Sequence, residues 1–300
     1  MPHPGPRRAR ELWLLLEPIH AVTYFSPEPL AALKHAGYRG FWMGYFAGRA
    51  APLGPVSAEL VHALFYNFAF EHVSRALPDA WAFAPPGAAL EAREAGSVAA
   101  LTRHLGDLAQ APAVARAAEI ASAAASSAPM EGRPLFAANR TIPEPEKPLA
   151  RLWHAATLLR EHRGDAHVAA LVAAGISGRE SHVLHALHSG TSEEVYVTAR
   201  NLGAEEWRSI LDRLQERGLV AGSGGLTESG AATKQTIEDR TDALAWTAFD
   251  HLGEARVDEL LGALRPITAA VVAAGEIPTH SPMGLDLTDS AAARAPAPSG

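Results

Sequence analysis

The chain has 300 residues, a net charge of −7 and no cysteine, which excludes disulfides, thiolate metal sites and cysteine nucleophiles. An apolar fraction of 48%, rich in alanine and poor in β-branched runs, predicts a mainly α-helical globular protein of one large or two ordinary domains.

The first predicted element is a helix over residues 10–22, which Pro18 kinks or ends early. Its apolar run is short and is interrupted by Glu17 and Pro18, so it does not have the pattern of a signal peptide. No stretch approaches the roughly 18 apolar residues of a membrane span. We therefore expect a soluble, cytoplasmic protein with no membrane partner.

A second helix is predicted to begin after Ser26, which has the residue type of an N-cap, and to stop at Gly37. Residues 38–49 are dense in glycine and aromatic side chains. A further helix is predicted from Ser57 to Leu77, because apolar residues recur at helical spacing until Pro78.

The region 20–72 mixes hydrogen-bonding groups with large apolar ones, which is the composition of a small-molecule pocket. An ordinary aromatic core whose polar tips are satisfied is the alternative. The candidate ligand-binding residues in this region are His20, Tyr24, Trp42, Tyr45, Arg49, Tyr66, Asn67 and His72.

Residues 109–129 are alanine-rich and predict a helix, whereas 130–148 contain several prolines and show no clear period. A connection of that length is unusual unless it serves a site. Asn139 and Arg140 in this loop are therefore candidates to complete the ligand pocket.

An amphipathic helix is predicted over 149–162, with Gly164 breaking it before a second helix that ends at Gly175. On one continuous helix His154 and His162 would share a face with carboxylates at 161 and 165, which is a catalytic or ligand-binding arrangement. With the break, His162 instead lies near a helix C-terminus. Both histidines are candidate ligand-binding residues.

Residues 179–230 have the pattern of a winged helix-turn-helix, in which short apolar-striped helices end at glycine-containing turns. Ser177-x-x-Glu180 and Thr191-x-x-Glu194 have the pattern of capping boxes. A third helix carries Trp207, Ile210 and Leu214 at core spacing. Three histidines at three-residue spacing in the first helix (182, 185 and 188) suggest a metal site only weakly, since they lie beside the core face, and no metal site is predicted.

The phrases Leu211-Asp212-Arg213-Leu214-Gln215-Glu216-Arg217-Gly218-Leu219-Val220 and Leu226-Thr227-Glu228-Ser229-Gly230 resemble the MarR-type winged helix. The stretches 18–25, 40–54, 132–139 and 152–175 resemble an actinobacterial family of helix-turn-helix domain-containing proteins. This resemblance implies a helical N-terminal region joined to a MarR-like C-terminal one, and it brings no particular activity with it.

The charge of the predicted winged helix disfavours DNA binding. Residues 179–250 contain seven basic and twelve acidic side chains, a balance of −5. Glu205 and Glu206 occupy the turn that should face DNA, and the wing at 220–226 is short and uncharged. If DNA is bound, the candidate contacts are Arg200, Trp207, Arg208 and Arg213.

The expected organisation is a helical domain (10–130), an irregular linker or site loop (131–148), a winged-helix domain with flanking helices (149–275) and a disordered tail (276–300). The preferred hypothesis is a protein that binds a small molecule and that could also be an enzyme. It is built on a winged-helix scaffold whose recognition of DNA has been weakened or lost. The alternative is a MarR-like, ligand-responsive regulator that binds DNA as a dimer. A homodimer through the helices at 229–249 and 256–274 is expected, and no cofactor is identifiable.

Overall fold

The computed structural model describes residues 5–278 and 285. Over these residues it contains fifteen α-helices, three short 3-10 helices and one isolated antiparallel bridge, between Val220 and Leu226. The mainly helical fold that the composition predicts is therefore confirmed.

The longest helix, α10, divides the chain into two series of elements. Those before it are α1 (Gly5–Phe25), α2 (Pro27–His35), α3 (Gly40–Ala50), η1 (Ala51–Leu53), α4 (Ala58–Phe65), α5 (Phe70–Ser74), α6 (Ala80–Phe83), α7 (Pro86–Leu105), η2 (Gly106–Gln110), α8 (Pro112–Ser127) and α9 (Pro134–Asn139). The others are α10 (Pro148–Ala173), α11 (Gly178–Ser189), α12 (Glu193–Arg200), α13 (Ala204–Glu216), α14 (Glu228–Trp246), η3 (Asp250–Leu252) and α15 (Glu254–Ala273).

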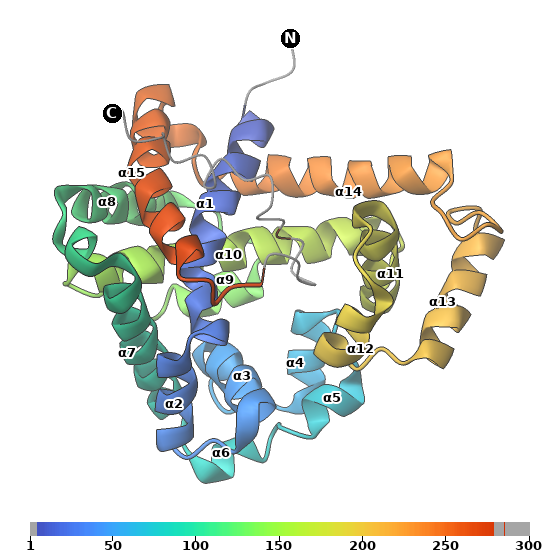
Figure 1. Ribbon diagram of the computed structural model, residues 1–300, viewed down its shortest axis with the longest axis horizontal. Helices are drawn as coiled ribbons and strands as arrows, with labels where there is room; N and C mark the ends of the chain where they lie inside the picture. Colours follow the sequence, from blue (N-terminus) through green and yellow to red (C-terminus); the bar gives the residue numbers. More distant parts are fainter. Residues whose placement is uncertain (1–4, 279–284, 286–300) are drawn as a thin grey trace.

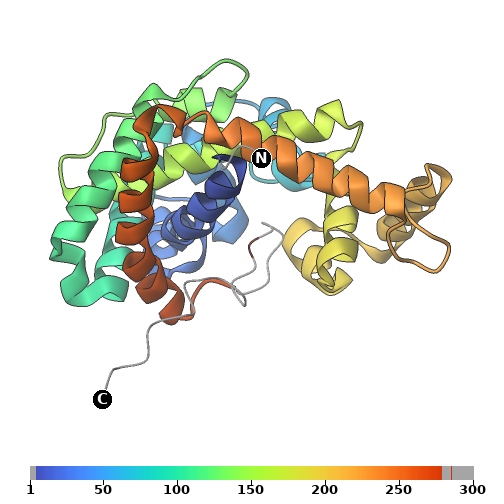
Figure 2. The same cartoon turned by 90° about the horizontal axis from the view of Figure 1, so that it is seen from above.

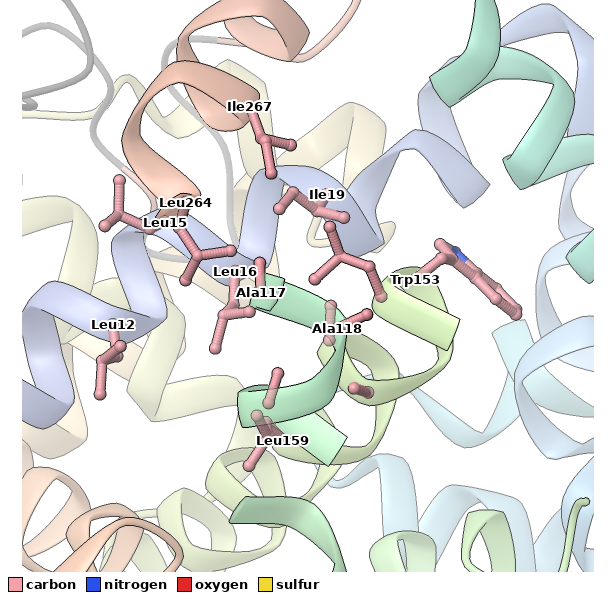
Figure 3. Packing of buried hydrophobic residues seen from close by; sticks show 14 of the residues in the cluster. Leu12, Leu15, Leu16, Ile19, Ala117, Ala118, Trp153, Leu159, Leu264 and Ile267 are labelled. Atoms are coloured by element: carbon pink, nitrogen blue, oxygen red, sulfur yellow. The ribbon is translucent and has the colours of Figure 1, made fainter. Parts of the chain in front are cut away.

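The largest hydrophobic core surrounds α10, which packs against α1, α8, α9 and α14 (Figure 1). Helix α15, near the end of the chain, packs against α1 at its beginning. The core side chains that meet there include Leu12, Leu15, Leu16 and Ile19 of α1, Ala117 and Ala118 of α8, Trp153 and Leu159 of α10, and Leu264 and Ile267 of α15 (Figure 3). The alanines of α8 are small enough to let α10 approach closely.

Pro18 does not end α1, which begins before the predicted start and continues to Phe25. Proline removes one backbone hydrogen bond from a helix interior. The residues on both sides of it, from Leu15 to Tyr24, are all buried, so tertiary packing holds the helix together across Pro18.

The prediction that Gly164 breaks the helix at 163–165 is wrong, because α10 is continuous from Pro148 to Ala173. Glycine costs a helix interior only about 1 kcal/mol relative to alanine. Burial of the residues around Gly164 offsets that cost, since Glu161, His162, Arg163, Asp165 and Ala166 are all buried.

The single helix predicted from Ser57 to Leu77 is also wrong. The chain leaves α4 at Tyr66, whose φ of +55° lies in the left-handed region, and a second short helix, α5, begins at Phe70. The tertiary reason is the close approach of the start of α11. A Cβ on Gly178 would lie 2.1 Å from the carbonyl oxygen of Tyr66.

The helix-turn-helix unit consists of α11, α12 and α13 around its own core (Figure 1). The capping box of Ser177 and Glu180 is confirmed, but α12 is capped by Ser192 and not by Thr191. Trp207, Ile210 and Leu214 are buried as their spacing predicts. The segment after α13 is a tight turn at 221–225, closed by the bridge between Val220 and Leu226.

Helix α14 links the two parts of the molecule. It runs from the tip of the helix-turn-helix unit back to α1 and α10, and Figures 1 and 2 show it extending out of the helical body. Of the tail predicted to be disordered, 279–284 and 286–300 lie outside the described residues. Glu276 pairs with Arg103, and Ile277 and Leu285 are buried in the largest core.

Candidate functional site

A cleft of about 1250 Å³ lies between the helical body and the helix-turn-helix unit. Its walls come from α1, α3, α4, α9, α10, α11, the end of α12, and α14, so segments far apart in the sequence enclose one space. Ligand sites in proteins are typically clefts of about 300–1000 Å³. The cleft is therefore large enough for a small organic molecule.

A small pocket that shares Tyr45 and Arg49 with the cleft contains Glu161 of α10, which is 2% exposed. Arg49 of α3 donates to both of its carboxylate oxygens, from Nε to Oε1 at 3.3 Å and from Nη2 to Oε2 at 3.4 Å. Nη1 of Arg160 lies 2.9 Å from Glu161 Oε1. Arg160 also faces Glu17 of α1, with Nε 3.6 Å from Oε1. This ion-pair cluster ties α1, α3 and α10 together.

Glu161 is ionised in the folded protein at neutral pH. Burial by itself raises the pKa of this carboxyl, but the charges of Arg160 and Arg49 and the hydrogen bond from Arg49 outweigh it and lower the pKa to about 2. Glu161 is therefore a permanent anion inside the protein, and it cannot act as a proton donor near neutral pH.

A hydrogen-bonded chain of neutral groups continues from this cluster into the core. Thr157 donates to the carbonyl of Trp153, so its hydroxyl oxygen accepts from Nδ1 of His20 at 2.9 Å. Nε2 of His20 then accepts from the hydroxyl of Tyr24 at 3.0 Å. Burial, together with the nearby charge of Arg160, lowers the pKa of His20 well below its usual value, in agreement with this neutral form.

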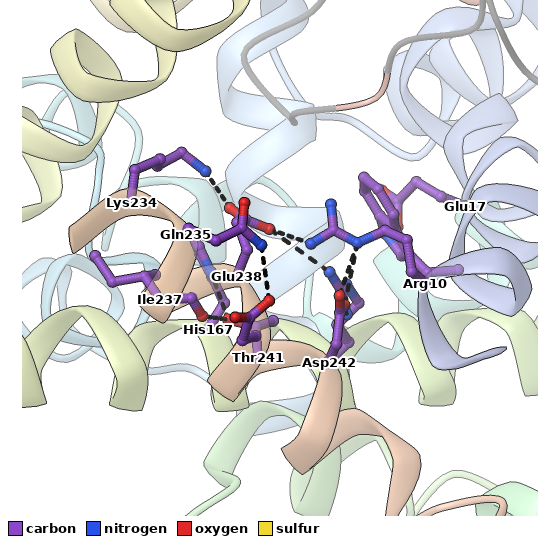
Figure 4. A network of polar contacts seen from close by, with 12 residues as sticks. Arg10, Glu17, His167, Lys234, Gln235, Ile237, Glu238, Thr241 and Asp242 are labelled. Carbon is purple, nitrogen blue, oxygen red and sulfur yellow. Dashed lines mark hydrogen bonds and ion pairs between the residues drawn. The ribbon is translucent and has the colours of Figure 1, made fainter. Parts of the chain in front are cut away.

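The outer end of the cleft carries a second charge network, between α1, α10 and α14 (Figure 4). Arg10 donates to Glu238 at 2.6 Å and to Asp242 at 3.0 Å, and Arg163 pairs with Asp242. Lys234 pairs with Glu238 along α14. The network fixes α14, and with it the helix-turn-helix unit, to the helical body.

Asp165 is a carboxyl of the cleft whose pKa is raised toward neutral pH. Its Oδ2 accepts from the backbone N–H of Phe136 at 2.9 Å. Burial raises the pKa of its carboxyl, the backbone hydrogen bond lowers it in part, and the net result is a pKa of about 7.

Because the folded pKa of Asp165 lies above its ordinary value of 3.8, this group favours folding below pH 4 and loses that contribution as the pH rises through 7. We expect Asp165→Asn, whose amide oxygen still accepts from Phe136, to remove this loss. Denaturant unfolding at pH 5 and pH 8 should then show wild type losing roughly 2–4 kcal/mol more than the variant between the two pH values. Identical pH dependence in the two proteins would contradict the raised pKa.

The structure brings several of the predicted ligand-binding residues together. His20, Tyr24, Tyr45 and Arg49 surround Glu161 in a small pocket, and Tyr45 and Arg49 also line the large cleft, as does Asn67.

The other predicted residues lie elsewhere. The ring of Trp42 packs against that of His72, with centroids 4.2 Å apart, and Tyr66 donates to the carbonyl of Ile176 at 2.7 Å. Asn139 is 1% exposed and accepts from Arg93. Arg140 donates to the carbonyls of Ala125 and Ser126 at the end of α8.

His154 and His162 are 3% and 1% exposed and line neither the cleft nor the small pocket. The ring of His162 packs on that of Phe136 at a centroid distance of 5.0 Å. Burial is the main reason that the pKa falls to about 4 for His154 and about 3 for His162. Both are neutral core side chains in this structure.

The candidate DNA contacts divide into two pairs. Arg208 and Arg213 are exposed on α13, whereas Trp207 and Arg200 are 6% and 9% exposed. Trp207 packs in the core of the helix-turn-helix unit, and Arg200 lines the cleft instead of the outer surface.

Sequence reasoning missed the pairing role of Arg160 and the charges of α1 and α14 that face the cleft, namely Arg10, Glu17, Glu238 and Asp242. A signal was available for Arg160 and Glu161, because they are adjacent charges within a long helix that also carries many apolar residues. Their partners come from α1 and α3, which no spacing within α10 indicates.

In the described part of the chain, no group of three or more histidine, aspartate or glutamate side chains is placed to hold a metal ion. None of the helices there is long and apolar enough to cross a membrane.

Comparison with known proteins provides one finding. A family model described as a helix-turn-helix family matches residues 9–278. No curated protein and no solved structure matches the chain.

Proposed function

The chain belongs to a helix-turn-helix family, and on that premise we propose that its helix-turn-helix unit forms one wall of a binding cleft for a small molecule. The observation that carries the proposal is the cleft of about 1250 Å³ whose lining residues come both from the helical body and from α11, α12 and α14. A molecule bound there touches both parts of the protein.

The chemistry of the walls supports binding of a polar molecule with an apolar portion. Tyr45, Phe65, Phe68 and Leu171 offer apolar surface in the same cleft as the arginines of α3, α10 and α12. Sites that combine aromatic surface with a few fixed polar groups are typical of ligand recognition.

The outer face of α13 is poorly suited to DNA. Glu205 is exposed at its start, and Glu206 is held at 2.7 Å by Arg179. The turn at 221–225 carries no charge. Affinity for DNA comes mainly from cations placed against phosphates, and only Arg208 and Arg213 are exposed along the middle of this helix.

The proposal is tested by screening metabolites for an increase in the unfolding temperature, Tm, with Val168→Trp as the control. Val168 is a half-buried residue of α10 that lines the cleft, so a larger side chain there projects into the space and obstructs it. A cleft ligand at about 100 times its Kd stabilises the folded state by about 2.7 kcal/mol. We expect ligands that stabilise wild type and not Val168→Trp. Equal stabilisation of both proteins, or none by any compound, would reject the cleft as a binding site.

Membership of the helix-turn-helix family favours a second candidate, a ligand-responsive regulator that binds DNA as a homodimer. This function predicts a salt-sensitive gel shift with genomic fragments that the double variant Arg208→Ala/Arg213→Ala weakens. It also predicts a dimer by light scattering. A monomer that shifts no fragment at low salt would reject the regulator and leave the cleft proposal standing.

A further inference from the structure

Arg200, the last residue of α12, is an arginine without an acidic partner. It is 9% exposed and lines the cleft. Its guanidinium lies over the ring of Phe68, 4.5 Å from the centroid, and Nη1 donates to the carbonyl of the preceding residue, Ala199, at 2.9 Å. Nε has no hydrogen-bond partner, and no carboxylate among residues 5–278 pairs with the side chain.

The other buried and half-buried arginines of the cleft are paired. Arg49 and Arg160 share Glu161, and Arg10 and Arg163 share Asp242. Arg200 differs from all four.

Near Arg200 the cationic groups outnumber the anionic ones. Arg49, Arg160 and Arg200 line the cleft. The carboxylates that pair with Arg49 and Arg160 are Glu161, which lies in the small pocket, and Glu17, and neither pairs with Arg200. Burial lowers the pKa of Arg200, Tyr45 and Tyr196 raise it in part, and the charges of Arg49 and Arg160 lower it further, with no carboxylate among these neighbours.

A buried guanidinium without a counter-charge is unfavourable, because one hydrogen bond and an aromatic contact do not repay the desolvation of a full charge as an ion pair would. Such a group in a native protein calls for a partner, and a bound ion or ligand is one of the ordinary explanations. Guanidinium groups bind carboxylate and phosphate oxygens in a bidentate geometry. The missing partner of Arg200 therefore has the chemistry of an oxyanion.

We propose that the cleft ligand is a small organic anion whose carboxylate, sulfonate or phosphate group is bound by Arg200, with Arg49 and Arg160 completing the positive surroundings. This inference rests on the proposed function of the cleft and adds the chemical class of the ligand. Tyr45, Phe65 and Phe68, which line the same part of the cleft, contact the organic portion. The anion joins α12 of the helix-turn-helix unit to α3 and α10 of the body.

The test compares wild type with Arg200→Met, which keeps an apolar side chain over Phe68 and removes the charge. The probes are sodium phosphate, sodium sulfate and sodium hexanoate, each at millimolar concentration and constant ionic strength. We expect at least one probe to raise the Tm of wild type, by about 5 °C when it is near saturation, and to leave the Tm of Arg200→Met unchanged. Without probe, Arg200→Met should have the higher Tm, since it lacks the uncompensated charge. A response to hexanoate supports an organic anion, whereas a response to phosphate or sulfate alone would indicate a free inorganic anion and would overturn the organic part of the inference.

Arg208→Ala is the matched control, because it removes a charge from the same helix-turn-helix unit outside the cleft. It should respond to the probes as wild type does. Equal responses of wild type and Arg200→Met, or no response of wild type to any of the three probes, would overturn the inference. A neutral ligand that stabilises wild type and Arg200→Met alike, but not Val168→Trp, would also overturn it and would leave the cleft proposal intact.

Discussion

Replacing Glu161 by alanine is expected to lower the free energy of unfolding by about 3–5 kcal/mol. The substitution leaves Arg49 without its carboxylate partner and leaves Arg160 with only the more distant Glu17. Removing one member of a buried ion pair is costly because the remaining charge stays desolvated. Urea unfolding at pH 7, followed by circular dichroism, measures the change directly.

Glu119→Ala is the control for this prediction. Glu119 pairs with Arg116 and Arg256 at the surface and is 54% exposed, so its loss should change stability little. If Glu161→Ala were no more destabilising than Glu119→Ala, the ion-pair cluster would contribute nothing measurable to the fold.

The pH dependence supplies a second check on Glu161. Its folded pKa of about 2 lies below the ordinary value of 4.5, so its contribution is complete above pH 4.5 and is lost as the pH falls through 2. Glu161→Gln, which keeps the shape of the side chain, should flatten this part of the stability profile. A profile that is unchanged in Glu161→Gln would show that another group is responsible for it.

Replacing Gly178 by alanine is expected to cost about 2–3 kcal/mol and to loosen the helix-turn-helix unit from the body. The added Cβ would lie 2.1 Å from the carbonyl oxygen of Tyr66 and 2.7 Å from Cα of Asn67. Both are backbone atoms and cannot move aside as a flexible side chain would. The same contact region includes the hydrogen bond from Tyr66 to the carbonyl of Ile176. Hydrogen exchange should show faster exchange in α11 together with the loss of stability.

Gly262→Ala serves as the comparison, since Gly262 lies in α15, is exposed, and has nothing within 4 Å of its added Cβ. Alanine there should stabilise the protein by up to about 1 kcal/mol, the difference in helix propensity. If Gly178→Ala behaved like Gly262→Ala, the contact between α4 and α11 would not hold the two parts of the protein together.

Local sequence patterns predicted the helix-turn-helix unit well because its signals lie within a few residues of one another. The capping box at Ser177, the helix end at Asn201 with its left-handed backbone, and the core spacing of Trp207, Ile210 and Leu214 are all present. The errors at Gly164 and Pro18 have a common cause. Gly164 and Pro18 weaken a helix locally, but dense packing around α10 and α1 outweighs the local cost, and a sequence window contains no information about that packing.

The candidate site was likewise predicted in part, because the sequence indicates residue types but not the direction in which a side chain faces. Sequence composition identified Tyr24, Tyr45 and Arg49, which lie around the buried Glu161, because aromatic and polar residues alternate along one stretch. It also included Trp42, His72, Asn139 and Arg140, since composition cannot distinguish a side chain that faces a cleft from one that faces the core. Arg200 was assigned to a DNA surface for a related reason.

The sequence alone determined the helical class, the helix-turn-helix unit and the acidic character of residues 179–250, because propensity, capping and charge are properties of neighbouring residues. Only the tertiary structure decided that Arg49 and Arg160 are neutralised by Glu161 and that Arg200 is not. Arg49 and Glu161 lie more than a hundred positions apart, on α3 and α10. Arg160 and Glu161 are adjacent in the sequence, but only the fold buries both of them against α1 and α3. A charge acts over a few ångströms of space, and the fold determines which charges come that close.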